Sequence, residues 1–376
     1  MAGGETLQLL LQGIANVSPQ SVIMLAIASV LLYLGIARNY EPLLLVPIGA
    51  GCLLANLPLS PLIAEEGMLR LLYHAGVANE VFPLLIFIGI GALTDFGPLL
   101  ENPRMVLLGA AGQFGIFLTL ILALLLGFSR EEAASISIIG AIDGPTSIYA
   151  SGILAPHLLG PITVAAYSYM ALVPIILPPI MRALTTPKER AIRMPYSQRT
   201  ISRRTRILFP IFVTVLVGTL VPFATPLIGM LMLGNLMKES GAVERLTKAS
   251  AAEIANVVTL FLGLAIGSTM VGVEFLKPST LAIMILGIIA FTFDAAAGLI
   301  FGKVLNVASG GRFNPLIGAA GISAFPMAAR VVHKVAQDED FENFLLMHAM
   351  GANAAGQVAS VVAGGVLLAL MGAGGH

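Results

Sequence analysis

The chain has 376 residues, of which 57% are hydrophobic and 11% are charged, and its formal net charge is zero. Soluble domains carry about 25% charged residues, so this chain lacks the polar side chains that a water-facing surface needs. The composition therefore excludes a soluble globular protein. The zero net charge gives no indication of the basic surface that nucleic-acid binding requires. We predict an all-α polytopic membrane protein.

The predicted membrane segments begin close to the N-terminus. Residues 1–5 lack the basic region of a secretory signal peptide, so we expect insertion without cleavage. Apolar runs of the length that crosses a hydrocarbon core of about 30 Å recur along the chain. The plainest are residues 23–37, 43–57, 106–128, 207–221 and 281–301. The single cysteine, Cys52, lies in the second run and is expected to be a buried structural thiol.

Two four-residue patterns resemble helix starts. Ser129 is followed by Glu132, and Ser250 is followed by Glu253, at the spacing of a capping box. An acidic group at residues 338–342 precedes the last apolar run, where we expect it to complement a helix N-terminus in water.

The stretch 138–147 is apolar but is interrupted by Gly144 and Pro145. It also contains Asp143, a carboxylate that is costly inside a membrane unless it is paired, protonated or bound to a cation. The break frees backbone carbonyls, and Thr146 and Ser147 add hydroxyl oxygens. Hard cations such as Na⁺ take oxygen ligands, so we interpret Asp143 as an ion or proton site. A structural Asp that caps a half-helix is the alternative.

One stretch is strongly basic. Eight of the chain's 20 Lys and Arg residues fall between Arg182 and Arg206. The positive-inside rule places this linker, residues 182–206, in the cytoplasm. It serves as a topology signal, or it docks a partner or anionic lipid headgroups.

The linker separates two membrane halves, 1–181 and 207–376. The second half has its own interrupted segment near residues 312–327, broken by Gly and Pro like the first. Interrupted segments at corresponding places in two halves are typical of transporters with inverted repeats and a binding site at the membrane midplane. We therefore predict inverted repeats with broken or re-entrant helices.

The second interrupted segment supplies neutral oxygen donors, namely Asn314, Ser323 and the backbone around Gly318. Arg330 follows Ser323 by seven residues, which places both on one face if the segment is helical there. A guanidinium near a membrane site holds a carboxylate substrate bidentately, although Arg330 could also be an anchor at the cytoplasmic end.

Polar residues also occur in the spans that follow the two interruptions. Tyr167 and Tyr169 lie in the first, and either could simply pack with one hydrogen-bond partner. Asn353 and Gln357 lie four apart on one face in the second, and Asn353 is either interhelical glue or a ligand.

Three further acids lie near apolar runs. Asp95 and Glu274 are near basic residues at expected span ends and are weak candidates. Asp294 lies deeper in an apolar run and is left open as a second relay or a paired structural acid. The chain has no nucleotide-binding loop, no metal-ligand histidine spacing and no nucleophile elbow, so any pumping must draw its energy from another source.

The motifs resemble those of a known family. Residues 140–146, Gly-Ala-Ile-Asp-Gly-Pro-Thr, look like the signature of the β subunits of sodium-transporting carboxylic acid decarboxylases. The resemblance extends over nearly the whole chain, through residues 166–174, 178–186, 234–241, 314–323 and 327–332.

The resemblance implies a fold similar to elevator-type transporters, a homotrimer and a defined chemistry. A carboxyltransferase (α) subunit moves a substrate carboxyl group onto a biotin carrier subunit. The β subunit, with a small membrane-anchored subunit, then decarboxylates the carboxybiotin, consumes a proton and exports Na⁺ across the cell's inner membrane.

The resemblance also implies roles for individual residues. Asp143 would be the central acid that binds Na⁺ and couples to protons, Tyr169 would serve coupling or proton delivery, and Arg330 would meet the carboxybiotin. The Na⁺ sites would be formed or shaped by Asn314, Gly318, Ser323 and Asn353.

Some alternatives remain open on the sequence. The substrate of the complex could be glutaconyl-CoA, methylmalonyl-CoA, oxaloacetate or malonate, and the short segment before the first span resembles the acyl-CoA members. One or two Na⁺ ions could move per decarboxylation. A stand-alone secondary transporter, either a Na⁺-coupled carboxylate carrier or a Na⁺/H⁺ exchanger, would use the same residues. A passive channel is disfavoured because the polar residues cluster at the interruptions.

Overall fold

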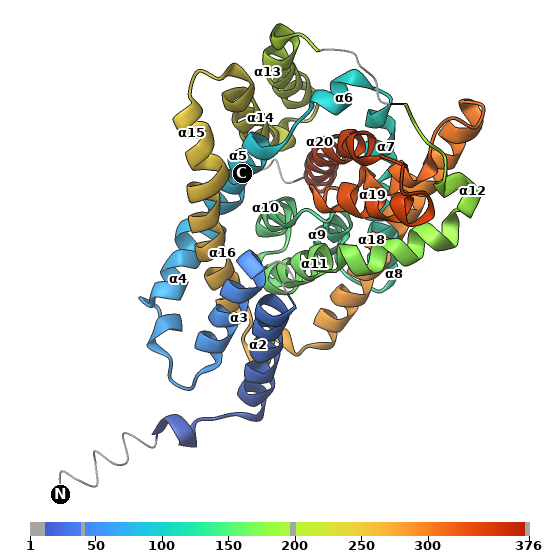
Figure 1. Cartoon of the computed structure of the whole chain (residues 1–376). Helices are drawn as coiled ribbons and strands as arrows, with labels where there is room; N and C mark the ends of the chain where they lie inside the picture. The colour runs from blue at the N-terminus through green and yellow to red at the C-terminus, as the bar shows by residue number, and fades with distance from the viewer. Residues whose placement is uncertain (1–11, 39–41, 196–200, 373–376) are drawn as a thin grey trace, which may run out of the picture.

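A computed structural model describes residues 12–38, 42–195 and 201–372, and every regular element within these ranges is a helix (Figure 1). Residues 1–5 and Arg199 of the basic linker lie outside this part of the chain, as does the side chain of Glu274. The prediction of an all-α polytopic membrane protein is confirmed, because the described residues contain five helices long and apolar enough to span a membrane, or seven if two bent pairs each count as one span.

The first half contains the helices up to the basic linker. The main ones are α2 (Pro19–Ala37), α3 (Pro42–Asn56), α4 (Met68–Leu72), α5 (Val81–Leu93), α6 (Gly97–Glu101), α7 (Met105–Ala111), α8 (Phe114–Leu125), α9 (Arg130–Ser137), η3 (Ile138–Ala141), α10 (Gly144–Leu154) and α11 (Leu159–Leu184), and α12 (Pro187–Arg190) lies within the linker.

The second half follows the linker. Its main helices are α13 (Arg203–Leu220), α14 (Thr225–Ser240), α15 (Glu244–Ala249), η6 (Ser250–Ile254), α16 (Ala255–Thr269), α18 (Pro278–Ala308), η7 (Pro315–Gly321), α19 (Met327–Glu339) and α20 (Leu346–Leu370). Four of the five apolar runs fall in the candidate spans. The run 207–221 lies in α13, which is not among them and begins with three arginines in its first four residues.

The helices form two lobes, and each lobe takes elements from both halves of the sequence (Figure 1). In one lobe α3 packs against α2 and α16, and α5 packs against α14. In the other lobe α18 packs against α11, α8 and η7, and α20 packs against α7 and η7. The segments on either side of the linker are therefore interleaved rather than separate.

The packing between the halves is reciprocal. In chain order, α3 and α5 of the first half correspond to α14 and α16 of the second, and the contacts are α3 with α16 and α5 with α14. Likewise α11 packs on α18 while α20 packs on α7, and α10 packs on α20 while α19 packs on α11. Several contacts of a first-half element with a second-half element thus have a counterpart in which the two roles are exchanged.

Glycines allow the closest of these contacts. A Cβ added to Gly91 of α5 would lie 1.9 Å from the carbonyl oxygen of Leu231 in α14. A Cβ on Gly234 of α14 would lie 2.0 Å from the carbonyl oxygen of Ile88. Small residues let membrane helices approach closely, and these two glycines serve that purpose between α5 and α14.

The basic linker is paired with acids at the end of α19. We call this group of ion pairs the linker clasp. Arg190 is its buried member, with a side chain 8% exposed, and its guanidinium also donates to the Thr185 carbonyl at 2.5 Å. The pairs are Arg182 with Asp338 at 2.9 Å, Arg190 with Glu339 at 2.6 Å, and Arg193 with Asp340 at 2.5 Å and Glu342 at 2.8 Å.

The clasp corrects the prediction for the acidic group. The first turn of α20 contains no acidic residue, so residues 338–342 do not complement its N-terminus. Their charges are instead balanced by arginines more than 140 positions earlier in the chain. Sequence distance concealed this partner, because a long-range ion pair leaves no local pattern.

The predicted helix starts have different outcomes. Ser129 begins α9 with both bonds of a capping box, as predicted. The prediction for Ser250 is wrong, because Ser250 lies inside a continuous helical stretch, at the start of the π-helix η6 between α15 and α16. Tertiary contacts hold that stretch: the Ser250 carbonyl would be 2.8 Å from a Cβ on Gly89. Cys52 is a buried free thiol, as expected.

Candidate functional site

The first interruption places Asp143 at the start of a buried helix. After α9 and η3, Ile142 adopts a left-handed conformation with φ of 53°, and Asp143 is the N-cap of α10. Asp is a favoured N-cap residue, and Pro145 is tolerated in the first helical turn because its missing N–H has no intrahelical partner there. A β-branched residue with positive φ is strained, and such strain persists only where the surroundings enforce it.

Hydroxyl groups surround the Asp143 carboxylate, which is 3% exposed. It accepts bonds from the Thr146 hydroxyl at 2.6 Å and from the Thr146 backbone N–H at 3.4 Å. Ser360 of α20 donates its hydroxyl to the same carboxylate at 3.2 Å. Within the described ranges no Lys, Arg or His forms an ion pair with Asp143, so a cation or a proton must compensate its burial.

The second interruption meets the first at Ser323. The Ser323 N–H donates to the Ala141 carbonyl at 3.2 Å, and the Ser323 hydroxyl donates to the Gly356 carbonyl of α20 at 2.9 Å. Ser323 comes after η7 and before α19, so it does not share a helix with Arg330. The expected common helical face is therefore wrong, although both residues line one cavity.

Two amides of α20 hold the end of the second interruption. Asn353 donates its amide to the carbonyl of Ile322 at 2.6 Å and to that of Ala320 at 3.2 Å. Gln357 donates its amide to the Ser323 carbonyl. The amide oxygens of both residues are buried and have no hydrogen-bond partner in the described structure. They are free to act as ligands.

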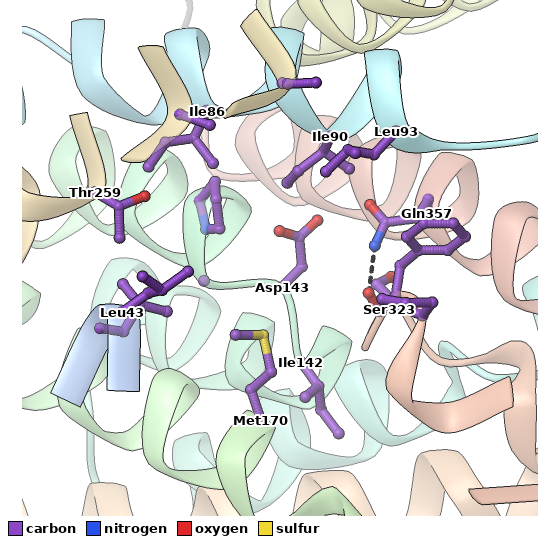
Figure 2. Close-up of a pocket in the computed structure, with 18 of the residues that line it drawn as sticks. Leu43, Ile86, Ile90, Leu93, Ile142, Asp143, Met170, Thr259, Ser323 and Gln357 are labelled. Carbon is purple, nitrogen blue, oxygen red and sulfur yellow. Dashed lines mark hydrogen bonds between the residues drawn. The ribbon is translucent and has the colours of Figure 1, made fainter. Parts of the chain in front are cut away.

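A cavity of about 680 Å³ opens beside Asp143 between the two lobes (Figure 2). Asp143 and Gln357 face it, and Gln357 is bonded to Ser323 on the same side. Thr259 and Asn256 of α16 line it from the other lobe. The remaining wall is mainly apolar, with residues of α3, α5 and the start of α20.

Arg330 also lines this cavity. Its side chain is exposed, and within the described part of the chain it has no ion-pair partner. The same lining includes Leu346 and Met347 at the start of α20, which follows the acids of the linker clasp in the chain. Asp143 and Arg330 therefore line one cavity.

Four predicted site residues lie outside this cavity lining, namely Asn353, whose bonds are given above, and Asn314, Gly318 and Tyr169. Asn314 donates its amide to the carbonyls of Arg190 and Ile192 at 2.9 and 2.8 Å, and its oxygen accepts from the Leu316 N–H at 3.0 Å. Gly318 packs against α18, where its Cβ would lie 1.9 Å from the Gly298 carbonyl oxygen. Both residues position η7, one at the linker and one against α18.

Tyr169 is the last of these four residues. It lies in a separate apolar cluster, and its hydroxyl donates to the Met284 carbonyl of α18. The tyrosine that lines the cavity is Tyr167, and its ring would lie 2.1 Å from a Cβ on Gly144. Two residues of offset on α11 decide which ring lies against Gly144, and the sequence does not reveal this orientation.

Two contributors were not predicted as site residues. Gln357 and Ser360 follow Asn353 by four and seven positions, so all three share one face of α20. That periodicity is the signal that could have identified them.

Asp95 is an acid at the end of a span. It accepts a hydrogen bond from the Gly97 N–H at 2.8 Å and pairs with Arg206 at 3.4 Å.

These features define a polytopic helical membrane protein in which a carboxylate is enclosed where two interrupted segments meet. Residues 20–371 match the family described as the Na⁺-transporting oxaloacetate decarboxylase beta subunit. The chain belongs to this family, and the predicted resemblance is confirmed.

Individual relatives fall into more than one named group. A methylmalonyl-CoA decarboxylase subunit beta from Veillonella parvula is 52% identical, with 93% of each chain covered. The oxaloacetate decarboxylase beta chain 2 of Salmonella typhi is 48% identical, covering 97% of this chain and 98% of the relative. A glutaconyl-CoA decarboxylase subunit beta from Acidaminococcus fermentans is 49% identical, with 94% of this chain covered.

Proposed function

We propose that this chain is the membrane subunit of a biotin-dependent decarboxylase, in which it decarboxylates carboxybiotin and couples that step to Na⁺ export. The observation that carries the proposal is Asp143, a carboxylate enclosed at a helix break with no cationic partner among the described residues, in a chain of this family. Family membership disfavours the alternative of a stand-alone carboxylate carrier or Na⁺/H⁺ exchanger, because the relatives are named as decarboxylase subunits.

Asp143 would bind the transported Na⁺ with neutral oxygens around it. The free amide oxygens of Gln357 and Asn353 and the Ser323 hydroxyl supply the donor type that a hard cation requires. Among the described residues no cluster of three or more His, Cys, Asp or Glu side chains exists, which suits a monovalent ion better than a transition metal. Asn314 and Gly318 would act indirectly, by fixing η7.

The same carboxylate would link Na⁺ to protons. Carboxybiotin loses CO₂ when the bond from the ring nitrogen to the carboxyl carbon breaks, and a proton must then be added to that nitrogen. Asp143 binds either a proton or Na⁺, so consumption of the proton changes which cation it holds. Transport of one charge against the membrane potential costs about 2.3 kcal/mol per 100 mV.

Carboxybiotin would enter through the cavity mouth at Arg330. An exposed guanidinium without a partner is suited to a carboxylate, and the cavity extends from it to Asp143. The biotin is carried by a partner subunit, and the β designation of the relatives implies an α subunit as well. The small membrane-anchored subunit and the homotrimer are proposed on the family resemblance.

We also propose that residues 1–181 and 207–376 are inverted repeats that work as an elevator. The reciprocal packing of α3 with α16 and α5 with α14 supports the repeats. The position of the cavity between the lobes supports movement of one lobe past the other. The positive-inside rule favours a cytoplasmic linker and hence a cavity that opens to the cytoplasm.

The test is Na⁺-stimulated decarboxylation of the carboxylated biotin carrier by the purified complex. The wild-type activity should require Na⁺ and be blocked by avidin, and Asp143→Asn should abolish it. Glu244→Gln is the matched control, because Glu244 is an exposed acid paired only with Lys248 at 2.7 Å. Avidin-insensitive transport of a carboxylate by the chain alone in liposomes would support the carrier instead.

A further inference from the structure

The span at residues 105–125 is interrupted, although its sequence contains no proline and no charged residue. α7 ends at Ala111 and α8 begins at Phe114, with Gly112 and Gln113 between them. The backbone N–H groups at the start of α8 therefore have no partners in their own helix and must find acceptors elsewhere. We call this point the α7–α8 break.

Asp294 of α18 provides the acceptor. Its carboxylate accepts from the backbone N–H groups of Gly115 and Ile116, which places a negative group at the positive end of α8. Asp294 is 0% exposed, and its second carboxylate oxygen, Oδ2, has no hydrogen-bond partner in the described structure. Within those residues it also lacks an ion-pair partner, so this buried acid is not part of a salt bridge. Such an acid marks a functional position inside a membrane protein.

The first interrupted segment rests on this acid. A Cβ on Gly140 would lie 2.7 Å from Asp294 Oδ2 and 3.4 Å from the Ile116 nitrogen. Gly140 is three residues before Asp143, and its neighbour Ala141 accepts the bond from Ser323. A shift of Asp294 or of the start of α8 would therefore move the backbone that positions the ion site.

The second interrupted segment rests on the other side of the same break. A Cβ on Gly112 would lie 2.5 Å from the Gly321 carbonyl oxygen, and the Gln113 amide donates to that oxygen at 3.4 Å. Gln113 is 3% exposed, and its own amide oxygen has no partner among the described residues. Gly321 is two residues before Ser323, so this contact positions the second arm of the site.

We propose that Asp294 and Gln113 are positioning residues that fasten the two interrupted segments to the α7–α8 break and thereby set the Na⁺ affinity of the site between them. The inference rests on the proposed role of Asp143. Asp294 acts through Gly140 on the Asp143 side, and Gln113 acts through Gly321 on the Ser323 side. Neither residue lines the cavity beside Asp143.

The test compares Asp294→Asn, Gln113→Leu and the double variant in the intact complex. Asparagine keeps the size of the side chain and one acceptor but loses the charge at the start of α8. We expect the Na⁺ concentration for half-maximal decarboxylation to rise about three- to thirty-fold, while the maximal rate stays within about two-fold of wild type. The change in the Na⁺ requirement of the double variant, expressed as a free energy, should differ from the sum of the two single changes, because both residues act on the α7–α8 break.

Thr292→Val is the matched control on α18, because Thr292 bonds only to the Ile288 carbonyl one turn earlier. It should leave the Na⁺ requirement unchanged. A merely structural role for Asp294 would lower the yield and melting temperature of the complex without changing the Na⁺ requirement, and that result would overturn the proposal. If Asp294→Asn does not assemble, Gln113→Leu decides the question by the same readout.

Failure of this inference is distinguishable from failure of the proposed function. Full Na⁺-dependent activity in Asp143→Asn would show that Asp143 is not the Na⁺ site, and the proposed function would fail. If Asp143→Asn is inactive while Asp294→Asn and Gln113→Leu keep the wild-type Na⁺ requirement, only the positioning role of Asp294 and Gln113 is refuted.

Discussion

Gly144→Ala tests whether Tyr167 fixes the start of α10. The new Cβ would lie 2.1 Å from Cζ of Tyr167 and 2.6 Å from its hydroxyl oxygen. Ordinary contacts begin near 3.4 Å, so the ring or the helix start must move by about 1.3 Å. Tyr167 is 2% exposed and lines the cavity, so either its ring moves into the cavity or the start of α10 shifts, and both change the surroundings of Asp143.

The expected effect follows from overpacking at the cap of Asp143. Extra methyl groups in well-packed cores cost about 1–3 kcal/mol. If that energy acts on the geometry of the ion site, the Na⁺ concentration for half-maximal decarboxylation rises about five- to 150-fold. The measurement is a Na⁺ titration of the decarboxylation rate in the purified complex.

Gly152→Ala is the control, because Gly152 lies in the same helix and a Cβ there would meet no atom within 4 Å. Tyr167→Leu should relieve part of the defect of Gly144→Ala, because it removes the clashing ring atoms. If Gly144→Ala titrates like Gly152→Ala, Tyr167 does not determine the geometry of Asp143 and the assignment of this tyrosine is refuted.

Three further predictions concern the linker end of the molecule. Arg190→Gln should destabilise the linker by about 2 kcal/mol, and limited proteolysis of residues 182–206 should accelerate. The loss is smaller than the roughly 3–5 kcal/mol of a fully buried ion pair because Glu339 is 27% exposed. Hydrogen bonds from Arg193 lower the pKa of Asp340 below its ordinary 3.8, so this ion pair should stabilise the linker throughout pH 5–8. Its contribution should be lost only as the pH falls below 3.8 through the lowered pKa. Faster proteolysis of the linker between pH 7 and 5 would contradict this assignment. Arg330→Gln should raise the concentration of carboxylated carrier needed for half-maximal rate and leave the Na⁺ requirement unchanged, and a shifted Na⁺ titration would place Arg330 at the ion site instead.

Part of the candidate site is predictable from the sequence. Asp143 is recognisable because a carboxylate next to Gly-Pro in an apolar segment has few explanations in a membrane. Asn353 and Gln357 are recognisable as a polar face of α20 because their spacing is local. The position of Asn314 at the linker and the choice of Tyr167 over Tyr169 depend on packing between segments far apart in the chain.

The chain by itself determined the class of the protein, because an apolar composition with few charges can be stable only when its helices are in lipid. It also determined that the helices are interrupted near Asp143, since Gly and Pro act on the backbone locally. Only the tertiary structure decided which acids pair with the basic linker, that α8 begins at an acid of α18, and that the two interruptions meet at Ala141 and Ser323. These contacts join residues that are distant in sequence, so no local pattern specifies them and they form only when the lobes pack together.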